Sequence, residues 1–228
     1  FIWYDDRYFD NMAESYVQWI NGSGLANWTA NGVLLSQESG FFQFYPMISG
    51  TNLANELVVF WNKVNSNQSM AALMMQRIDL GGNLLETIHG KTILPINAQL
   101  SNGIKATQFG DSTYYLYNRY QDGSSYLTNY NFIGLDKSGN QLWPNPIEIV
   151  NSPKDRSHPH MSDWHSYQAV ICWTDEMLGG NRTMAQNVFT DGALGSSPVS
   201  VEEPLMEDQK HYFVAFQNNT HHLVIKDL

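Results

Sequence analysis

The 228-residue sequence contains one cysteine, few basic residues and no long apolar segment. Cys172 cannot form an internal disulfide, and its position in the apolar run Ala169–Trp173 predicts a buried structural thiol. Twelve Lys plus Arg against 22 Asp plus Glu give a formal net charge of −10, which excludes a protein that binds nucleic acid through a basic surface. The longest apolar run, Met70–Met75, is too short to span a bilayer.

Charged residues make up 15% of the chain, below the roughly 25% that is typical of soluble proteins. The polar residues are instead largely neutral, with 22 Asn among them, and aromatic residues reach 13%. Together with 17 Gly, this composition favours strands and turns over helices.

A repeat of about 57 residues runs through the chain. Short apolar runs that end in an aromatic residue recur, and the aromatic residues are separated by 58, 56, 56 and 43 positions. The five runs are Phe1–Trp3, Val58–Trp61, Tyr114–Tyr117, Val170–Trp173 and Phe213–Phe216. A fixed period of this length indicates a repeat architecture.

Two further elements recur with the same period. A strand-like segment containing Gln in most copies ends at a polar residue, and Gly follows three or four positions later, which predicts a tight turn. The polar residues are Asn21, Asp79, Asp136 and Asp191, and the glycines are Gly24, Gly82, Gly139 and Gly195. Strands that begin near a proline precede the aromatic runs, at Tyr45–Ser49, His158–Ser162 and Glu203–Met206.

With a fourth strand near Val33–Ser36, Thr92–Pro95 or Ile147–Val150, each repeat holds four short strands. This pattern predicts an all-β protein, a β-propeller of four-stranded antiparallel blades. We expect one propeller domain or propeller fragment of about four and a half blades, with the first two strands of the N-terminal blade absent. The predicted repeat units are 1–36, 37–94, 95–150, 151–201 and 202–228.

The repeat resembles a blade found in secreted and cell-surface bacterial proteins, especially Bacteroidetes proteins exported by type IX secretion. The shared pattern is apolar-apolar-Trp-x-Asp-x-Arg, then Ala-Gln-x-Ile-Asp-x-x-Gly-x-x-x-Trp. Trp3–Arg7 matches its first half, and Gln76–Asn83 and Gln18–Gly24 match its second. Some copies depart from it, since Lys63 and Arg119 replace the Asp and Glu86 stands where Trp is expected. The resemblance implies a propeller and an exported or surface-displayed protein, and it does not imply one reaction.

The densest group of metal-ligand residue types lies in the second half of the chain. His158 and His160 alternate on a predicted strand, which would put both rings on one face, and Asp163 and His165 follow closely. These four residues are candidate metal ligands, although the segment is also simply one copy of the proline strand. We expect no organic cofactor.

Exposed aromatic side chains are the other candidates for a binding surface. Trp19 stands where the next repeat has Arg77, which indicates a position that tolerates exposure. We name Trp19, Trp164, His158 and His160 as candidate binding residues. Most other aromatic residues, Trp61 and Trp173 among them, are expected to pack between blades.

The sequence contains no defined catalytic constellation. We therefore predict a non-catalytic secreted or surface-displayed module that binds a protein partner or a glycan through its loops, as in adhesion. It would belong to a longer exported chain or to a cell-envelope complex. The alternative is a secreted glycoside hydrolase of propeller fold, whose carboxylates come from different blades and lie about 5–9.5 Å apart.

Overall fold

A computed structural model describes residues 1–51, 54–98, 100–120, 128–150, 155–176, 180–195, 199–200, 211–217 and 220–226. For residues 100, 101, 199, 200, 211–217 and 220–226 it describes the backbone only.

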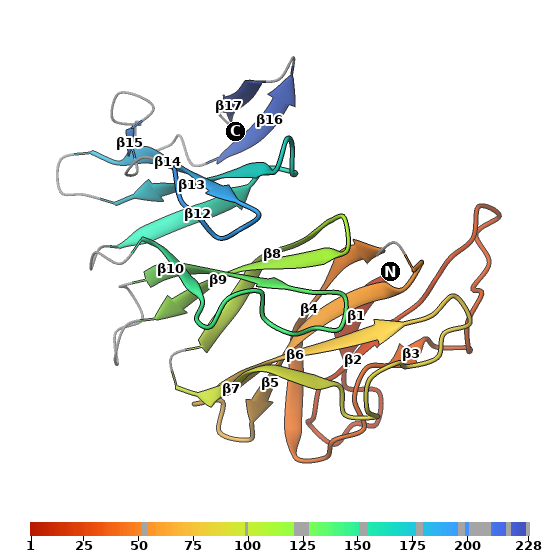
Figure 1. Cartoon of the computed structure of the whole chain (residues 1–228). Coiled ribbons are helices and arrows are strands. Elements are labelled where there is room, and N and C mark those ends of the chain that lie inside the picture. The colour runs from red at the N-terminus through yellow and green to blue at the C-terminus, as the bar shows by residue number, and fades with distance from the viewer. Residues whose placement is uncertain are drawn as a thin grey trace. The chain divides into compact units, whose positions relative to one another are not determined.

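The described chain consists of strands in five antiparallel sheets and contains no helix (Figure 1). The first sheet has three strands, β1 (Ile2–Asp5), β2 (Glu14–Val17) and β3 (Val33–Leu34). The second has β4 (Phe41–Thr51), β5 (Leu57–Asn65), β6 (Ala71–Ile78) and β7 (Lys91–Asn97). The third has β8 (Leu100–Phe109), β9 (Ser112–Tyr120), β10 (Thr128–Leu135) and β11 (Ile147–Val150). The fourth has β12 (Arg156–Met161), β13 (Gln168–Asp175), β14 (Arg182–Phe189) and β15 (Val199–Ser200), and the last pairs β16 (His211–Gln217) with β17 (Thr220–Lys226).

The predicted all-β fold of four-stranded antiparallel sheets is confirmed, and it is the blade architecture of a β-propeller. Three of the five aromatic-ended runs lie in β5, β9 and β13, which have a neighbour on each side and are buried along most of their length. The first sheet differs from the prediction because it has three strands, so only the first strand of the repeat lacks a counterpart in it. The predicted strand Glu203–Met206 lies outside the described residues, and the predicted repeat boundaries stay a prediction.

The proline of the first strand in a sheet lies inside the strand, at a β-bulge, and does not begin the strand. In β4 the register shifts between Phe44 and Met47, and Tyr45, which precedes Pro46, has a φ of 53°. In β12 the shift lies between Ser157 and His160, and His158 before the proline has a φ of 51°. Both are edge strands, where the missing N–H of proline and the extra residue of a bulge are tolerated.

The predicted turns form, with one correction. The amides of Gly24, Gly82 and Gly139 donate to the carbonyl oxygens of Asn21, Asp79 and Asp136, and all three glycines have positive φ. In the fourth sheet the same bond runs from Gly192 to Phe189, so these residues take the places predicted for Gly195 and Asp191. Asp191 instead accepts a hydrogen bond from the amide of Ala193 at 2.9 Å.

The recurring glutamine is structural. Nε2 of Gln18 donates to the carbonyl oxygen of Thr29 at 2.8 Å, and Oε1 accepts the amides of Trp19 and Trp28. Gln76 repeats this arrangement, with Nε2 on the carbonyl oxygen of Thr87 at 3.0 Å. The buried amide therefore fixes the loop that follows the strand.

Glycines with positive φ also allow close packing on large side chains. A Cβ on Gly32 (φ 84°) would overlap the indole of Trp3, and one on Gly90 (φ 76°) would overlap that of Trp61. The turn glycines pack likewise on the preceding sheet, and the pairs are Gly82 with Trp28, Gly139 with Met75 and Gly192 with Trp143.

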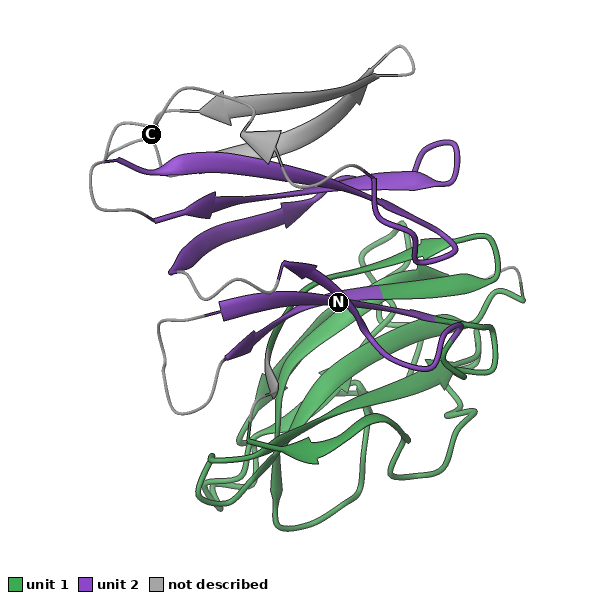
Figure 2. Cartoon of the chain, turned by 60° about the vertical axis from the view of Figure 1, so that its left-hand side comes forward, with its two compact units in different colours: residues 1–114, 135–141 green, residues 115–134, 142–228 purple. Residues whose placement is uncertain are grey.

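The chain divides into two compact units, residues 1–114 with 135–141 and residues 115–134 with 142–228 (Figure 2). The first unit contains a buried apolar cluster, to which Val17 and Leu35 of the first repeat and Val59, Trp61 and Ile78 of the second contribute. In the second unit Tyr130, Phe132, Ile171 and Trp173 are buried. No segment of the described chain is a helix that could cross a membrane.

Candidate functional site

A cavity of about 430 Å³ lies in the first unit, where the start of β1 and the ends of β2, β4 and β6 meet the start of β5. Its volume is within the range of small-molecule sites. Its lining residues are Phe1, Gln18, Trp19, Trp28, Ile48, Thr51, Asn55, Leu57, Ile78, Asp79 and Leu80.

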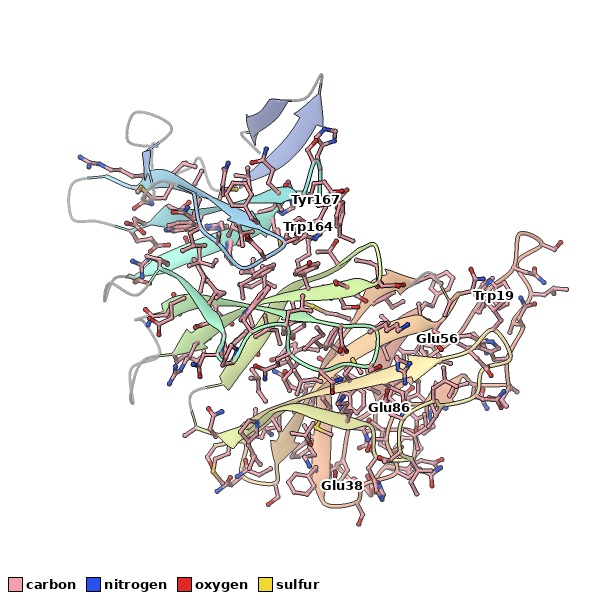
Figure 3. All side chains as sticks on the ribbon, viewed as in Figure 1. Trp19, Glu38, Glu56, Glu86, Trp164 and Tyr167 are labelled. Carbon is pink, nitrogen blue, oxygen red and sulfur yellow. The ribbon has the colours of Figure 1, made fainter. Side chains whose placement is uncertain are left out.

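Two tryptophans, with Phe1, form the aromatic part of this pocket. The rings of Trp19 and Trp28 meet edge to face, with centroids 6.4 Å apart and an interplanar angle of 69°. The indole N–H of Trp28 donates to the carbonyl oxygen of Leu80 at 3.0 Å, and the ring packs on Gly82. Trp28 is thus fixed on both sides, while Trp19 follows β2 with 41% of its surface exposed (Figure 3).

The polar side chains of the pocket are those of Gln18, Thr51, Asn55 and Asp79, of which Asp79 carries a charge. Oδ1 of Asp79 accepts the amides of Gly81 and Asn83, each at 2.8 Å, and Oδ2 accepts Nδ2 of Asn83 at 2.9 Å. These hydrogen bonds, that of the Asn83 side chain above all, hold the pKa of Asp79 below its usual range. The carboxylate is therefore ionised at neutral pH and held rigidly at the pocket.

Beside the pocket, Arg77 occupies the place in β6 that Trp19 occupies after β2. Its guanidinium lies between two carboxylates, Glu86 at 2.7 Å and Glu56 at 3.1 Å, which Figure 3 labels. The pair Arg77–Glu86 thus replaces the pair Trp19–Trp28 of the preceding repeat. This exchange explains why Glu86 stands where the repeat pattern has Trp.

The four candidate metal ligands of the second unit do not form a metal site. Among the described residues, no group of three or more His, Cys, Asp or Glu is arranged to hold a metal ion, and this includes His158, His160, Asp163 and His165. The bulge at His158 and Pro159 interrupts the two-residue alternation on which one shared face for the histidines depends. His158 is exposed, and its Nδ1 lies 2.7 Å from Oγ of Ser157.

Trp164 precedes a tight hairpin turn in the second unit. Its ring is partly buried, with its centroid 6.1 Å from that of Phe132. His165 and Gln168 exchange both backbone hydrogen bonds around Ser166 and Tyr167, which have φ values of 46° and 67°. Tyr167 is 67% exposed at this turn (Figure 3). The turn is a type I′ turn built without glycine.

Of the four candidate binding residues, Trp19 alone lines the pocket. His158, His160 and Trp164 belong to the second unit, and their binding role stays a prediction. Sequence reasoning missed Asp79 and Leu80 as neighbours of Trp19, because the hydrogen bond that joins Trp28 to Leu80 links residues 52 positions apart. The repeat pattern places Trp28 and Leu80 in different repeats, so it gave no signal for this contact.

No protein-family model and no curated protein matches the chain. Among solved structures, it is similar to a thermostable family-43 glycoside hydrolase, with 10% identity over 94% of this chain and 75% of that chain, and a TM-score of 0.50. An endo-arabinase from Bacteroides thetaiotaomicron matches 100% of this chain and 89% of its own length at 13% identity and a TM-score of 0.48. An α-L-arabinofuranosidase from Lactobacillus brevis matches 98% and 78% at 12% identity and a TM-score of 0.48.

The similarity to the family-43 enzyme agrees with the four-stranded antiparallel sheets of this chain. The class that the fold defines is therefore the β-propeller, an architecture that this chain shares with that glycoside hydrolase. Identities this low show the fold alone.

Proposed function

We propose that this chain acts on carbohydrate, and that it binds a saccharide in the pocket formed by Trp19, Trp28 and Asp79. The pocket is the observation that carries the proposal. It combines an exposed indole with apolar side chains and a few polar groups, a composition that suits a sugar ring with its apolar faces and hydroxyl groups.

Hydrolysis of a glycosidic bond is the reaction that best accompanies this binding. The similarity of the fold to a family-43 glycoside hydrolase supports a hydrolase over a module that only binds. Hydrolysis requires two carboxyl groups about 5–9.5 Å apart. Several described carboxylates already serve the fold, because Asp5, Glu38, Glu56, Glu86 and Asp175 bind Arg or Lys side chains. The catalytic pair would therefore come from other acids of the chain.

Binding without hydrolysis is the second candidate, and the carboxylates engaged in ion pairs favour it. In that case the chain is a carbohydrate-binding module. Export, surface display and a protein partner remain predictions from the resemblance of the repeat, and the comparison with solved structures adds only that this fold occurs in glycoside hydrolases.

The test is a panel of neutral oligosaccharides and polysaccharides, with binding followed by calorimetry and hydrolysis by release of reducing ends. We expect Trp19→Ala to weaken binding at least tenfold, since burying an aromatic face contributes about 1.5–3 kcal/mol. Tyr167→Ala is the matched control, because it removes an exposed aromatic ring from the other unit. Binding with product release supports the hydrolase, and binding alone supports the module. If no saccharide binds, or if Trp19→Ala binds as the unaltered chain does, the proposal is wrong.

A further inference from the structure

The charges around the pocket bear on which saccharides it accepts. Among its lining residues, all of which the structure describes, Asp79 carries a negative side chain and none carries a positive one. An acidic sugar would therefore bring its carboxylate close to a fixed carboxylate, with no cationic side chain of the lining to bind it.

The nearest cationic side chain in the sequence is also engaged. Arg77 lies two residues before Asp79, and its guanidinium is bound by Glu86 and Glu56 at 2.7 and 3.1 Å. The charges of Arg77, Glu56 and Glu86 therefore sum to −1, and the formal net charge of the whole chain is −10. Each of these features disfavours an anionic ligand.

We propose that the pocket selects neutral saccharides and discriminates against acidic ones, such as those containing uronic acids, through the carboxylate of Asp79. This inference rests on the proposed function. It specifies the substrate class of the same pocket: uncharged, hydroxyl-rich sugars that pack on Trp19 and bond to Thr51, Asn55 and Asp79.

The repeat supplies the substitution that tests the inference. In the first sheet the equivalent turn has Asn21, whose Oδ1 accepts the amides of Ser23 and Leu25 at 2.9 and 3.1 Å. Asp79→Asn therefore removes the charge with a residue that already closes the same turn elsewhere in this chain. Asp136→Asn is the matched control, because Asp136 closes the third such turn and does not line the pocket.

The experiment compares the dissociation constants of a neutral oligosaccharide and of the same oligosaccharide with one uronic acid, at low and at high salt. The amino group of Phe1 donates to the carbonyl oxygen of Gln18 beside the pocket, so all variants carry a short Gly-Ser extension that moves this charge away. The ratio of the two constants cancels any loss that affects both ligands equally.

We expect the unaltered chain to bind the neutral ligand about fivefold more tightly at low salt, the effect of two like charges about 4 Å apart in water. Asp79→Asn brings the ratio close to one, Asp136→Asn leaves it unchanged, and high salt reduces it. A ratio of one or less in the unaltered chain, or a ratio that Asp79→Asn does not change, overturns the inference and leaves saccharide binding intact. If neither ligand binds, the proposed function fails and the inference with it.

Discussion

The indole N–H of Trp173 donates to Oδ1 of Asp175, two residues along β13, at 2.8 Å. Trp3 makes the same bond to Oδ2 of Asp5 at 2.8 Å. In β5 the corresponding residues are Trp61 and Lys63, and a lysine cannot accept a hydrogen bond. The indole nitrogen of Trp61 is accordingly buried with no hydrogen-bond partner among the described residues.

This difference predicts unequal effects for the same substitution. Trp173→Phe loses a bond to a charged acceptor, which contributes about 1.5–3 kcal/mol. Trp61→Phe loses a similar buried apolar area. It also removes a buried donor without a partner, and leaving such a donor unpaired costs about 1–3 kcal/mol. We expect Trp173→Phe to lower the free energy of unfolding by roughly 2.5 kcal/mol or more relative to Trp61→Phe, as measured by urea denaturation. Equal losses, or a greater loss for Trp61→Phe, would contradict this explanation.

Two glycines with similar backbone angles differ in the space around them. Gly32 (φ 84°) packs on the indole of Trp3, whereas a Cβ on Gly24 (φ 79°) has no neighbour within 4 Å. We expect Gly24→Ala to lower the free energy of unfolding by roughly 1 kcal/mol, because alanine is strained at this positive φ. Gly32→Ala adds overlap with the ring, a further cost of about 1–3 kcal/mol. Thermal unfolding of both variants checks this, and similar melting temperatures would show that the contact with Trp3 has no energetic effect.

The pH dependence of stability follows from the carboxylate of Asp5. The hydrogen bonds from Arg7, with a further one from Trp3, lower the pKa of Asp5 below its usual value in the folded chain. The stabilisation is therefore present above the unfolded pKa of about 3.9 and is lost as the pH falls through the lower folded pKa. We expect Asp5→Asn to make the free energy of unfolding less dependent on pH below about pH 4.

The control for this measurement is Asp111→Asn at an exposed position, which keeps the bonds of Asp5. It should retain the acid sensitivity of the unaltered chain. A steep acid dependence that persists in Asp5→Asn would show that other carboxylates dominate.

The thiol of Cys172 is fully buried in β13, and burial raises its pKa well above the usual value. Because the thiolate is the reactive form, we expect the folded chain not to react with a thiol reagent at pH 8 over minutes. One equivalent should react after denaturation in urea. Rapid reaction of the folded chain would mean that this strand opens readily.

The sheets could be predicted from the sequence because their central strands are buried on both faces, so each appears as an apolar run at a fixed period. The turn of the fourth sheet could not, because Phe189 stands where the other copies have Asn or Asp. There the backbone hydrogen bond from Gly192 closes the turn without a side-chain acceptor. The sequence pattern pointed instead to Asp191, which lies two residues after Phe189 and is of the residue type found in the other copies.

The candidate site was predictable only in part. The substitution of Arg77 for Trp19 between repeats indicated that Trp19 stands at a position compatible with exposure, and 41% of it is exposed. The pocket itself depends on which ends of β1, β2, β4 and β6 lie together. The packing of one sheet on another leaves no periodic signal in the sequence. The bulge at His158 likewise escaped detection, because a proline in a strand does not reveal which way the preceding residue turns.

The contacts between turn glycines and the preceding sheet bear on how such a chain avoids misassembly. Tandem repeats risk docking out of order while they fold, since their strands resemble one another. Here Gly82 packs on the indole of Trp28, whereas Gly139 packs on the thioether of Met75, a side chain of different shape. Successive contacts therefore alternate in shape, because Gly192 packs again on an indole, that of Trp143. We expect this alternation to disfavour packing of a sheet on any sheet other than its neighbours in sequence.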